Sequence, residues 1–136
     1  MRALALDHGA ARTGVAVSDP TGTIARPLPA IARVDSRAGR AALDRVLEAE
    51  RPDVIVVGDP RGLGGGRGPQ ARAAGGFAGR LRARVEVPVV MWDERLTTVE
   101  AARRGREAGS GADLDSLAAC VLLESYLSAR AVAGGA

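Results

Sequence analysis

Short apolar runs separated by turn-forming residues mark the start of the chain. Residues 3–6 (Ala-Leu-Ala-Leu) and 15–17 (Val-Ala-Val) form two such runs, and the connection between them contains two glycines. Apolar runs joined by a glycine-containing turn predict a β-hairpin. Residues 24–34 continue as apolar pairs interrupted by Pro27 and Pro29, which predict an edge strand or a strand broken by a bend. This part of the chain therefore predicts an antiparallel meander.

The middle of the chain changes to helical spacing and then to a buried strand. Asp35 or Ser36 is placed to cap a helix that ends near Arg51, because residues 41, 42, 43, 46 and 47 form an apolar stripe. Residues 53–58 (Asp-Val-Ile-Val-Val-Gly) lack polar alternation, which predicts a strand buried on both faces. A glycine-rich loop leads to a helix predicted over residues 69–84, and residues 85–91 predict a fifth strand.

Two further helices are expected in the last third of the chain. Residues 97–100 (Thr-Thr-Val-Glu) fit a capping box, so a helix is predicted from there to about residue 108. Apolar residues at helical spacing predict the last helix from about Asp113 to Arg130. Residues 131–136 are expected to form a frayed tail.

The order of these elements predicts the fold class. A three-stranded antiparallel meander followed by parallel strands in βαβ crossovers gives an α/β fold, with a mixed five-stranded sheet and helices on both faces. This is the layout of the ribonuclease H-like fold. No internal repeat or linker interrupts residues 1–136, so they are expected to form a single ribonuclease H-like domain.

Several carboxylates fall where the predicted strands and helices begin or end. Asp7 closes the first strand, Asp59 leaves the central strand, and Asp93 and Glu94 follow the last strand. Asp113 and Asp115 open the final helix. Ligands gather at the carboxyl ends of strands in such sheets, and hard cations such as magnesium prefer oxygen ligands. Converging carboxylates are what two-metal phosphodiester hydrolysis needs.

Each acid also has a simpler interpretation. Asp7 can cap a turn, Asp115 can serve as a first-turn acid of its helix, and Asp93 and Glu94 can belong to a solvated loop. Taken singly these interpretations are preferred; taken together, the positions favour a metal site. His8 fits a general base or a substrate contact, but a histidine beside a turn is more often incidental.

Composition adds modest support for a nucleic-acid partner. All 19 basic residues are arginine, the net charge is +3, and arginine forks match phosphate oxygens. A GC-rich coding bias produces the same composition, so this support is weak. The single cysteine, Cys120, excludes an internal disulfide and a zinc site built from several cysteines. Neither a signal peptide nor a membrane-spanning run is recognisable, so a cytoplasmic protein is expected.

Four stretches resemble the YqgF family of Holliday-junction-resolvase-like proteins, also called pre-16S rRNA nucleases. They are residues 5–19 (ALDHGAARTGVAVSD), 56–58 with 68–71, 92–101 (WDERLTTVEA), and 115–119 with 125–127. The resemblance spans nearly the whole chain in order. It implies a ribonuclease H-like fold, a cytoplasmic role in maturing the 5′ end of 16S rRNA, and hydrolysis of nucleic acid with Mg²⁺ or Mn²⁺.

The resemblance also implies site residues. The acidic set would be Asp7, Glu94 (or its neighbour Asp93) and Asp115, with Arg12 and Arg95 on phosphate. Asp59 departs from the family, which usually has an apolar residue there; it either adds a ligand or has no role. The glycine-rich loop that follows Asp59 is a second departure from the family.

Three functions from different classes follow. The leading one is a metal-dependent endonuclease acting on structured RNA, with a four-way DNA junction as the alternative substrate. Arg61, Arg67 and Arg72 would then hold the nucleic-acid backbone. A second is a non-catalytic nucleic-acid-binding ribosome-assembly factor; a phosphotransferase ranks last. The chain is expected to be a monomer or a homodimer, and symmetric junction cutting would require the dimer.

Overall fold

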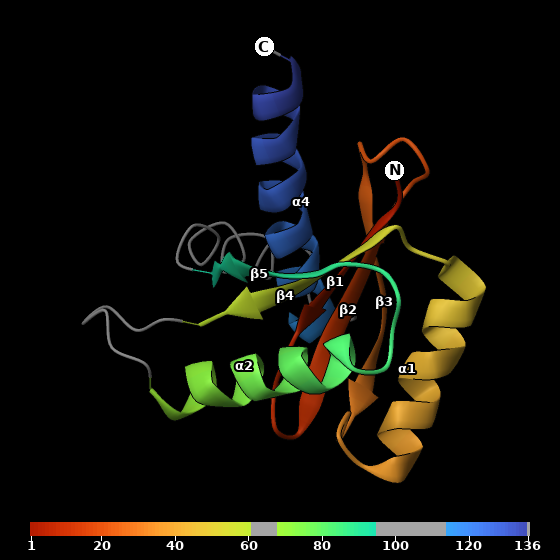
Figure 1. Ribbon diagram of the computed structural model, residues 1–136, viewed down its shortest axis with the longest axis vertical. Helices are drawn as coiled ribbons and strands as arrows, with labels where there is room; N and C mark the ends of the chain where they lie inside the picture. Colours follow the sequence, from red (N-terminus) through yellow and green to blue (C-terminus); the bar gives the residue numbers. More distant parts are fainter. Residues whose placement is uncertain (61–67, 95–113, 136) are drawn as a thin grey trace.

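The computed structural model describes residues 1–60, 68–94 and 114–135, and it forms a five-stranded sheet with helices on both faces (Figure 1). The sheet order is β3-β2-β1-β4-β5. β1 pairs antiparallel with β2 and β2 with β3, whereas β4 runs parallel to both β1 and β5. The predicted meander and parallel crossovers are confirmed. The elements are β1 (Ala3–Asp7), β2 (Arg12–Ser18), β3 (Ala25–Ala32), α1 (Arg37–Glu50), β4 (Val54–Asp59), α2 (Pro69–Arg82), β5 (Val89–Asp93) and α4 (Leu114–Gly135).

Alternating side chains of β1 and β4 build the two halves of the core. Leu4 and Leu6 face the side covered by α1 and α2, while Ala3 and Ala5 face α4. The β-branched run of β4 divides in the same way and is buried on both sides. The central strands are thus fixed between two apolar layers, so the residues at their ends are held in place.

Several boundaries differ from the predictions. β5 begins at Val89 rather than Val85, because Pro88 cannot donate a ladder hydrogen bond; its carbonyl accepts from Ile55 N at 2.9 Å instead. α4 continues to Gly135, so most of the tail expected to fray from Ala131 is helical. The prolines of β3 sit in one continuous edge strand, as one of the two alternatives predicted. The helix predicted over residues 97–108 lies outside the described residues.

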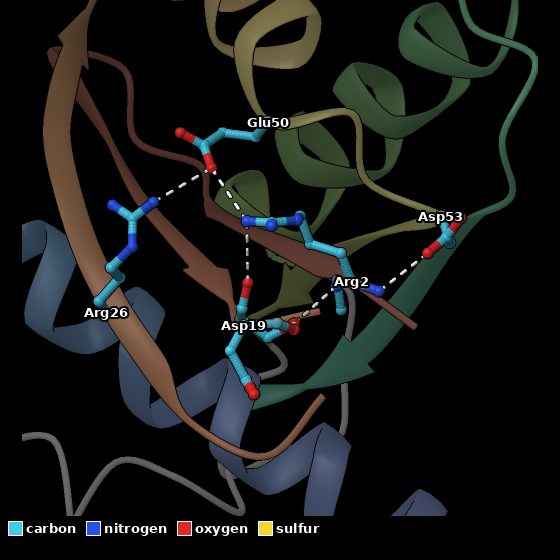
Figure 2. Close-up of polar contacts among 7 residues, drawn as sticks. Arg2, Asp19, Arg26, Glu50 and Asp53 are labelled. Atoms are coloured by element: carbon cyan, nitrogen blue, oxygen red, sulfur yellow. Dashed lines mark hydrogen bonds and ion pairs between the residues drawn. The ribbon is translucent and has the colours of Figure 1, made fainter. Parts of the chain in front are cut away.

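Charged contacts tie the sheet to α1 at the rim where β1 begins (Figure 2). Glu50 Oε1 lies 3.3 Å from Arg2 Nη1 and 3.2 Å from Arg26 Nη2, so one carboxylate joins the end of α1 to β3 and to the residue before β1. The backbone N–H of Arg2 donates to Asp53 Oδ2 at 2.8 Å. These contacts anchor the start of β1, and Asp7 lies at its other end. Among the described helices, none has the length and apolar character needed to cross a lipid bilayer.

Candidate active site

Asp7 is the last residue of β1 and points to the α4 side of the sheet. It follows Ala3 and Ala5 in the strand alternation, and both pack on the α4 side. In the β1–β2 ladder Asp7 lies opposite Gly14. The sequence placed Asp7 at the end of a core strand, and the structure confirms that position.

Gly14 lets the first turn of α4 rest on the sheet beside Asp7. A Cβ atom at Gly14 would lie 1.9 Å from the carbonyl oxygen of Asp115, so only glycine fits there. Ser116 holds the helix in the same place: its hydroxyl accepts from Val15 N at 3.2 Å and donates to the Leu28 carbonyl at 2.6 Å. The helix that carries Asp115 is therefore fixed against β2 and β3.

Glu94 reaches Asp7 across the end of β4. A Cβ atom at Gly58 would lie 2.7 Å from Glu94 Cδ, so the missing side chain of Gly58 leaves the space that the Glu94 carboxyl occupies. The carboxyls of Asp7 and Glu94 are hydrogen-bonded to each other. Of the two neighbouring acids considered from the sequence, Glu94 makes this contact with Asp7.

The pKa shifts of this pair indicate that its two carboxyls share a proton. Burial raises the pKa of Glu94 to about 9, and the hydrogen bond to Asp7 and the negative charge of Asp7 add to the effect. Burial also raises the pKa of Asp7, against the lowering effect of its hydrogen bond to Glu94. At neutral pH the protonated Glu94 carboxyl donates to the Asp7 carboxylate.

Three more acids lie near enough to the pair to act on it electrostatically. Asp59 and Asp93 are cross-strand neighbours at the ends of β4 and β5, and the negative charge of each raises the pKa of Glu94. Asp115 raises the pKa of Asp7 in the same way. Its carboxylate is ion-paired to Arg12, with Nε and Oδ2 3.3 Å apart. The predicted acids that the structure describes therefore lie at one rim, but Asp115 is ion-paired with Arg12.

The donor set suits a hard divalent cation. The candidate ligands at this rim are carboxylates, and two carboxyls that share a proton become two anionic oxygen ligands once that proton leaves. In the described part of the chain no three His, Cys, Asp or Glu side chains are placed together as a metal cluster. Magnesium is commonly held by one or two carboxylates with substrate phosphate completing the shell, so the Asp7–Glu94 pair is sufficient to begin a site.

A hollow of about 480 Å³ opens beside the pair, and we call it the active-site hollow. It is lined by Asp7, His8, Gly9, Ala10, Pro60, Pro69, Gln70, Ala73 and Glu94. The first turn of α2 thus faces the acids, and the positive end of a helix favours an anionic ligand there. A groove of about 540 Å³ between β3 and α1 is mostly apolar and contains none of the candidate acids.

His8 forms part of the wall of this hollow. Its ring stacks on Phe77 with centroids 4.8 Å apart, and its Nε2 lies 3.3 Å from Asp35 Oδ2. Its side chain is 8% exposed, so the contacts fix its position rather than leave it at the surface.

Residues 1–129 match the family described as RuvX, Holliday junction resolvase. The chain belongs to the RuvX family.

Relatives in this family carry the name "Putative pre-16S rRNA nuclease". The protein of that name from Geobacillus kaustophilus is 41% identical over 96% of this chain and 99% of its own length. The one from Moorella thermoacetica is 42% identical over 93% of this chain and 94% of its own. Both comparisons agree with the resemblance found in the sequence.

Solved structures agree on the fold. RuvC from T. thermophilus, solved in complex with a Holliday junction substrate, matches with a TM-score of 0.59 at 20% identity over 96% of both chains. The fowlpox virus resolvase, solved in complex with Holliday junction DNA, matches with a TM-score of 0.57 at 14% identity over 95% of this chain and 98% of that chain. The predicted ribonuclease H-like fold is confirmed.

The site of this RuvX-family chain holds residues that the sequence did not single out as functional. Gly58 and Ser116 create the space and the helix contact that bring the acids together, and Gln70 lines the hollow. Of the predicted phosphate-binding arginines, Arg12 pairs with Asp115 and Arg72 lies exposed in the first turns of α2. Arg61, Arg67, Arg95 and also Asp113 lie outside the described residues.

Replacing Gly14 with alanine is expected to destabilise the fold by about 3 kcal/mol or more, because the new methyl group would collide with the backbone of Asp115 and force α4 off the sheet. Chemical denaturation followed by circular dichroism measures the loss. Gly75→Ala is the matched control: nothing lies within 4 Å of a Cβ there, so this helix-interior change should stabilise by about 0.5–1 kcal/mol. Equal unfolding midpoints for the two variants would contradict the packing of α4 on Gly14.

Proposed function

We propose that this protein is a metal-dependent nuclease that hydrolyses phosphodiester bonds at the Asp7–Glu94 pair. The observation that carries the proposal is the direct hydrogen bond between two carboxyls from distant parts of the chain, at a rim crowded with further acids. Such an arrangement opposes folding in the absence of a cation, and a divalent cation offsets it. Residues 1–136 are taken as one nuclease domain acting in the cytoplasm.

The chain's own groups divide the work. Asp7 and Glu94 would hold Mg²⁺ or Mn²⁺. Asp115 would become a further ligand when its ion pair to Arg12 opens, and Asp93 is proposed as another ligand. The cation would supply a nucleophilic water near neutral pH and positive charge for the leaving oxygen. Glu94 must give up its proton for this, so cation binding releases a proton and strengthens as pH rises. Arg12, freed from Asp115, and Arg72 would hold phosphate oxygens; Arg61, Arg67 and Arg95 are proposed for the same role.

The proposed substrate is the 5′ end of pre-16S rRNA, cut endonucleolytically during ribosome biogenesis. The name carried by the relatives at about 40% identity over nearly their whole length supports it. A four-way DNA junction is the second candidate, supported by the family description and by the RuvC and fowlpox resolvase structures. That activity would need a homodimer to make paired cuts.

The test offers both substrates to the same preparation. Wild type is incubated with a pre-16S rRNA 5′ fragment and with a four-way DNA junction, each with Mg²⁺, with Mn²⁺ and with EDTA. Cleavage of the rRNA fragment at a defined site, lost in EDTA and in Asp7→Asn, is the expected result. Preferential cutting of the junction would transfer the proposal to resolvase activity. Metal-independent binding without cleavage of either substrate would favour a non-catalytic assembly factor instead.

A further inference from the structure

A second, basic cleft lies between the start of α1 and the end of α2, and we call it the α1–α2 cleft. Its volume is about 190 Å³, and it is lined by Asp35, Arg40, Phe77, Arg80, Leu81 and Arg84. Phe77 and Leu81 are buried and form an apolar floor, while the arginines are exposed around it. None of these residues was singled out as a nucleic-acid contact from the sequence.

Carboxylates hold the cleft's guanidinium groups in position. Arg80 donates from Nε and Nη2 to Asp35 Oδ1 at 3.2 and 3.0 Å, and Arg84 Nη2 is bonded to Asp44. Arg40 Nη1 donates to the backbone carbonyl of Asp35. A guanidinium has five N–H donors, so each arginine keeps donors for a further acceptor. Three arginines against two aspartates leave the cleft positive, although each aspartate also neutralises part of the charge of the guanidinium that it positions.

The α1–α2 cleft and the active-site hollow share one wall. His8 lines the hollow, Phe77 lines the cleft, and their rings stack with centroids 4.8 Å apart. His8 Nε2 also contacts Asp35, which lines the cleft. A nucleic-acid strand that runs from the acids across the His8–Phe77 wall would therefore reach the arginines of the α1–α2 cleft.

We propose that the α1–α2 cleft binds a backbone phosphate of the nucleic-acid strand that is cut, flanking the scissile phosphate. This inference rests on the proposed nuclease function and deepens it. The physical reason is charge: besides the protonated Glu94, the active-site rim carries Asp7, Asp59, Asp93 and Asp115, and these carboxylates repel a polyanion. Positive charge beyond the rim offsets that repulsion, and guanidinium forks suit phosphate oxygens.

The first experiment measures the salt dependence of binding to a fluorescein-labelled 12-nucleotide single-stranded RNA in EDTA, where no cleavage occurs. Arg80→Gln and Arg84→Gln are each expected to weaken binding about 3–10-fold at low salt and to reduce the slope of log affinity against log salt by about 0.7, the loss of one single-strand phosphate contact. Arg45→Gln is the matched control, since Arg45 is an exposed arginine of α1 that lines the groove toward β3. It should leave the slope unchanged, and Arg84→Lys should recover part of the affinity.

The second experiment predicts a gain. Asp44→Asn removes the carboxylate bonded to Arg84, so the freed guanidinium should bind the RNA about 3-fold more tightly. Glu48→Gln removes the same charge from an exposed position one helical turn further along and should have a smaller effect. A merely structural role for the Asp44–Arg84 pair predicts weaker binding in Asp44→Asn, together with a lower melting temperature.

Each outcome decides between the two proposals. Slopes of Arg80→Gln and Arg84→Gln equal to that of Arg45→Gln would overturn the α1–α2 cleft as a phosphate site, whether or not wild type cleaves. Wild type that binds with the expected slopes but cleaves nothing with Mg²⁺ or Mn²⁺ would sink the nuclease proposal and leave phosphate binding at the cleft standing. A third outcome is that wild type binds an acidic peptide but not the RNA, and that Arg80→Gln and Arg84→Gln lose the peptide. That outcome would assign the cleft to a protein partner and overturn the inference.

Discussion

Replacing Asp7 with asparagine is expected to lower the rate of metal-dependent cleavage by on the order of 10³-fold or more. Asp7 is the strand-end acid to which Glu94 is bonded and to which Asp115 is electrostatically coupled, so its loss removes the centre of the proposed cation site. Asparagine keeps the size of the side chain and removes one anionic ligand. Single-turnover cleavage of the rRNA fragment at saturating Mn²⁺ measures the change.

The same variant should keep its fold. Removing the negative charge of Asp7 also removes its repulsion with Asp115, so the melting temperature in metal-free buffer should stay the same or rise. Glu48→Gln serves as the control, because it removes an exposed carboxylate from α1, away from the acids. An Asp7→Asn variant that cleaves at the wild-type rate would show that the carboxylate rim is not the reaction centre.

Replacing Glu94 with glutamine is expected to stabilise the metal-free protein at pH 8 by roughly 1–3 kcal/mol while abolishing cleavage. The folded state raises the pKa of Glu94 from 4.5 to about 9, so between these values the folded chain holds a proton that the unfolded chain has released. Stability contributed by this group is therefore complete below pH 4.5 and is lost as pH rises toward 9. Glutamine keeps an N–H donor for Asp7 at every pH, so the decline should be absent in the variant.

Denaturant unfolding at pH 5, 6.5 and 8 in EDTA measures how the free energy of unfolding changes with pH. Glu86→Gln, which removes an exposed carboxylate between α2 and β5, should follow wild type. A thermal-shift titration with Mn²⁺ adds a second readout: wild type should gain stability with the cation and Glu94→Gln should gain much less, because one ligand is missing. Parallel pH slopes for wild type and Glu94→Gln would refute the shared proton.

Both variants are expected to show that the acids of this site lower the free energy of unfolding of the metal-free protein. Buried carboxylates next to one another are unfavourable for the folded chain alone, and the raised pKa of Glu94 expresses that cost. Cation binding would offset this cost, because the same carboxylate oxygens would then be ligands.

The sequence by itself determined the architecture and the general location of the site. The β-branched run of β4 can be buried on both faces only in a central strand covered by helices. Asp7 could be placed at a rim because it directly follows an apolar strand, and the resemblance extended over nearly the whole chain. These features depend on local pattern and on residue order, which the sequence contains in full.

Only the tertiary structure decided which side chains meet. Whether Asp93 or Glu94 reaches Asp7 depends on where β5 ends and which face each residue takes, and a shift of one residue reverses the face. The predicted end of β5 at Met91 left that choice open. Asp115 packs against Gly14 and Glu94 against Gly58, and each contact joins segments far apart in the chain. The same holds for the ion pairs of Arg80 with Asp35 and of Arg84 with Asp44. Local periodicity carries no information about such contacts, because they are set by how the helices pack on the sheet.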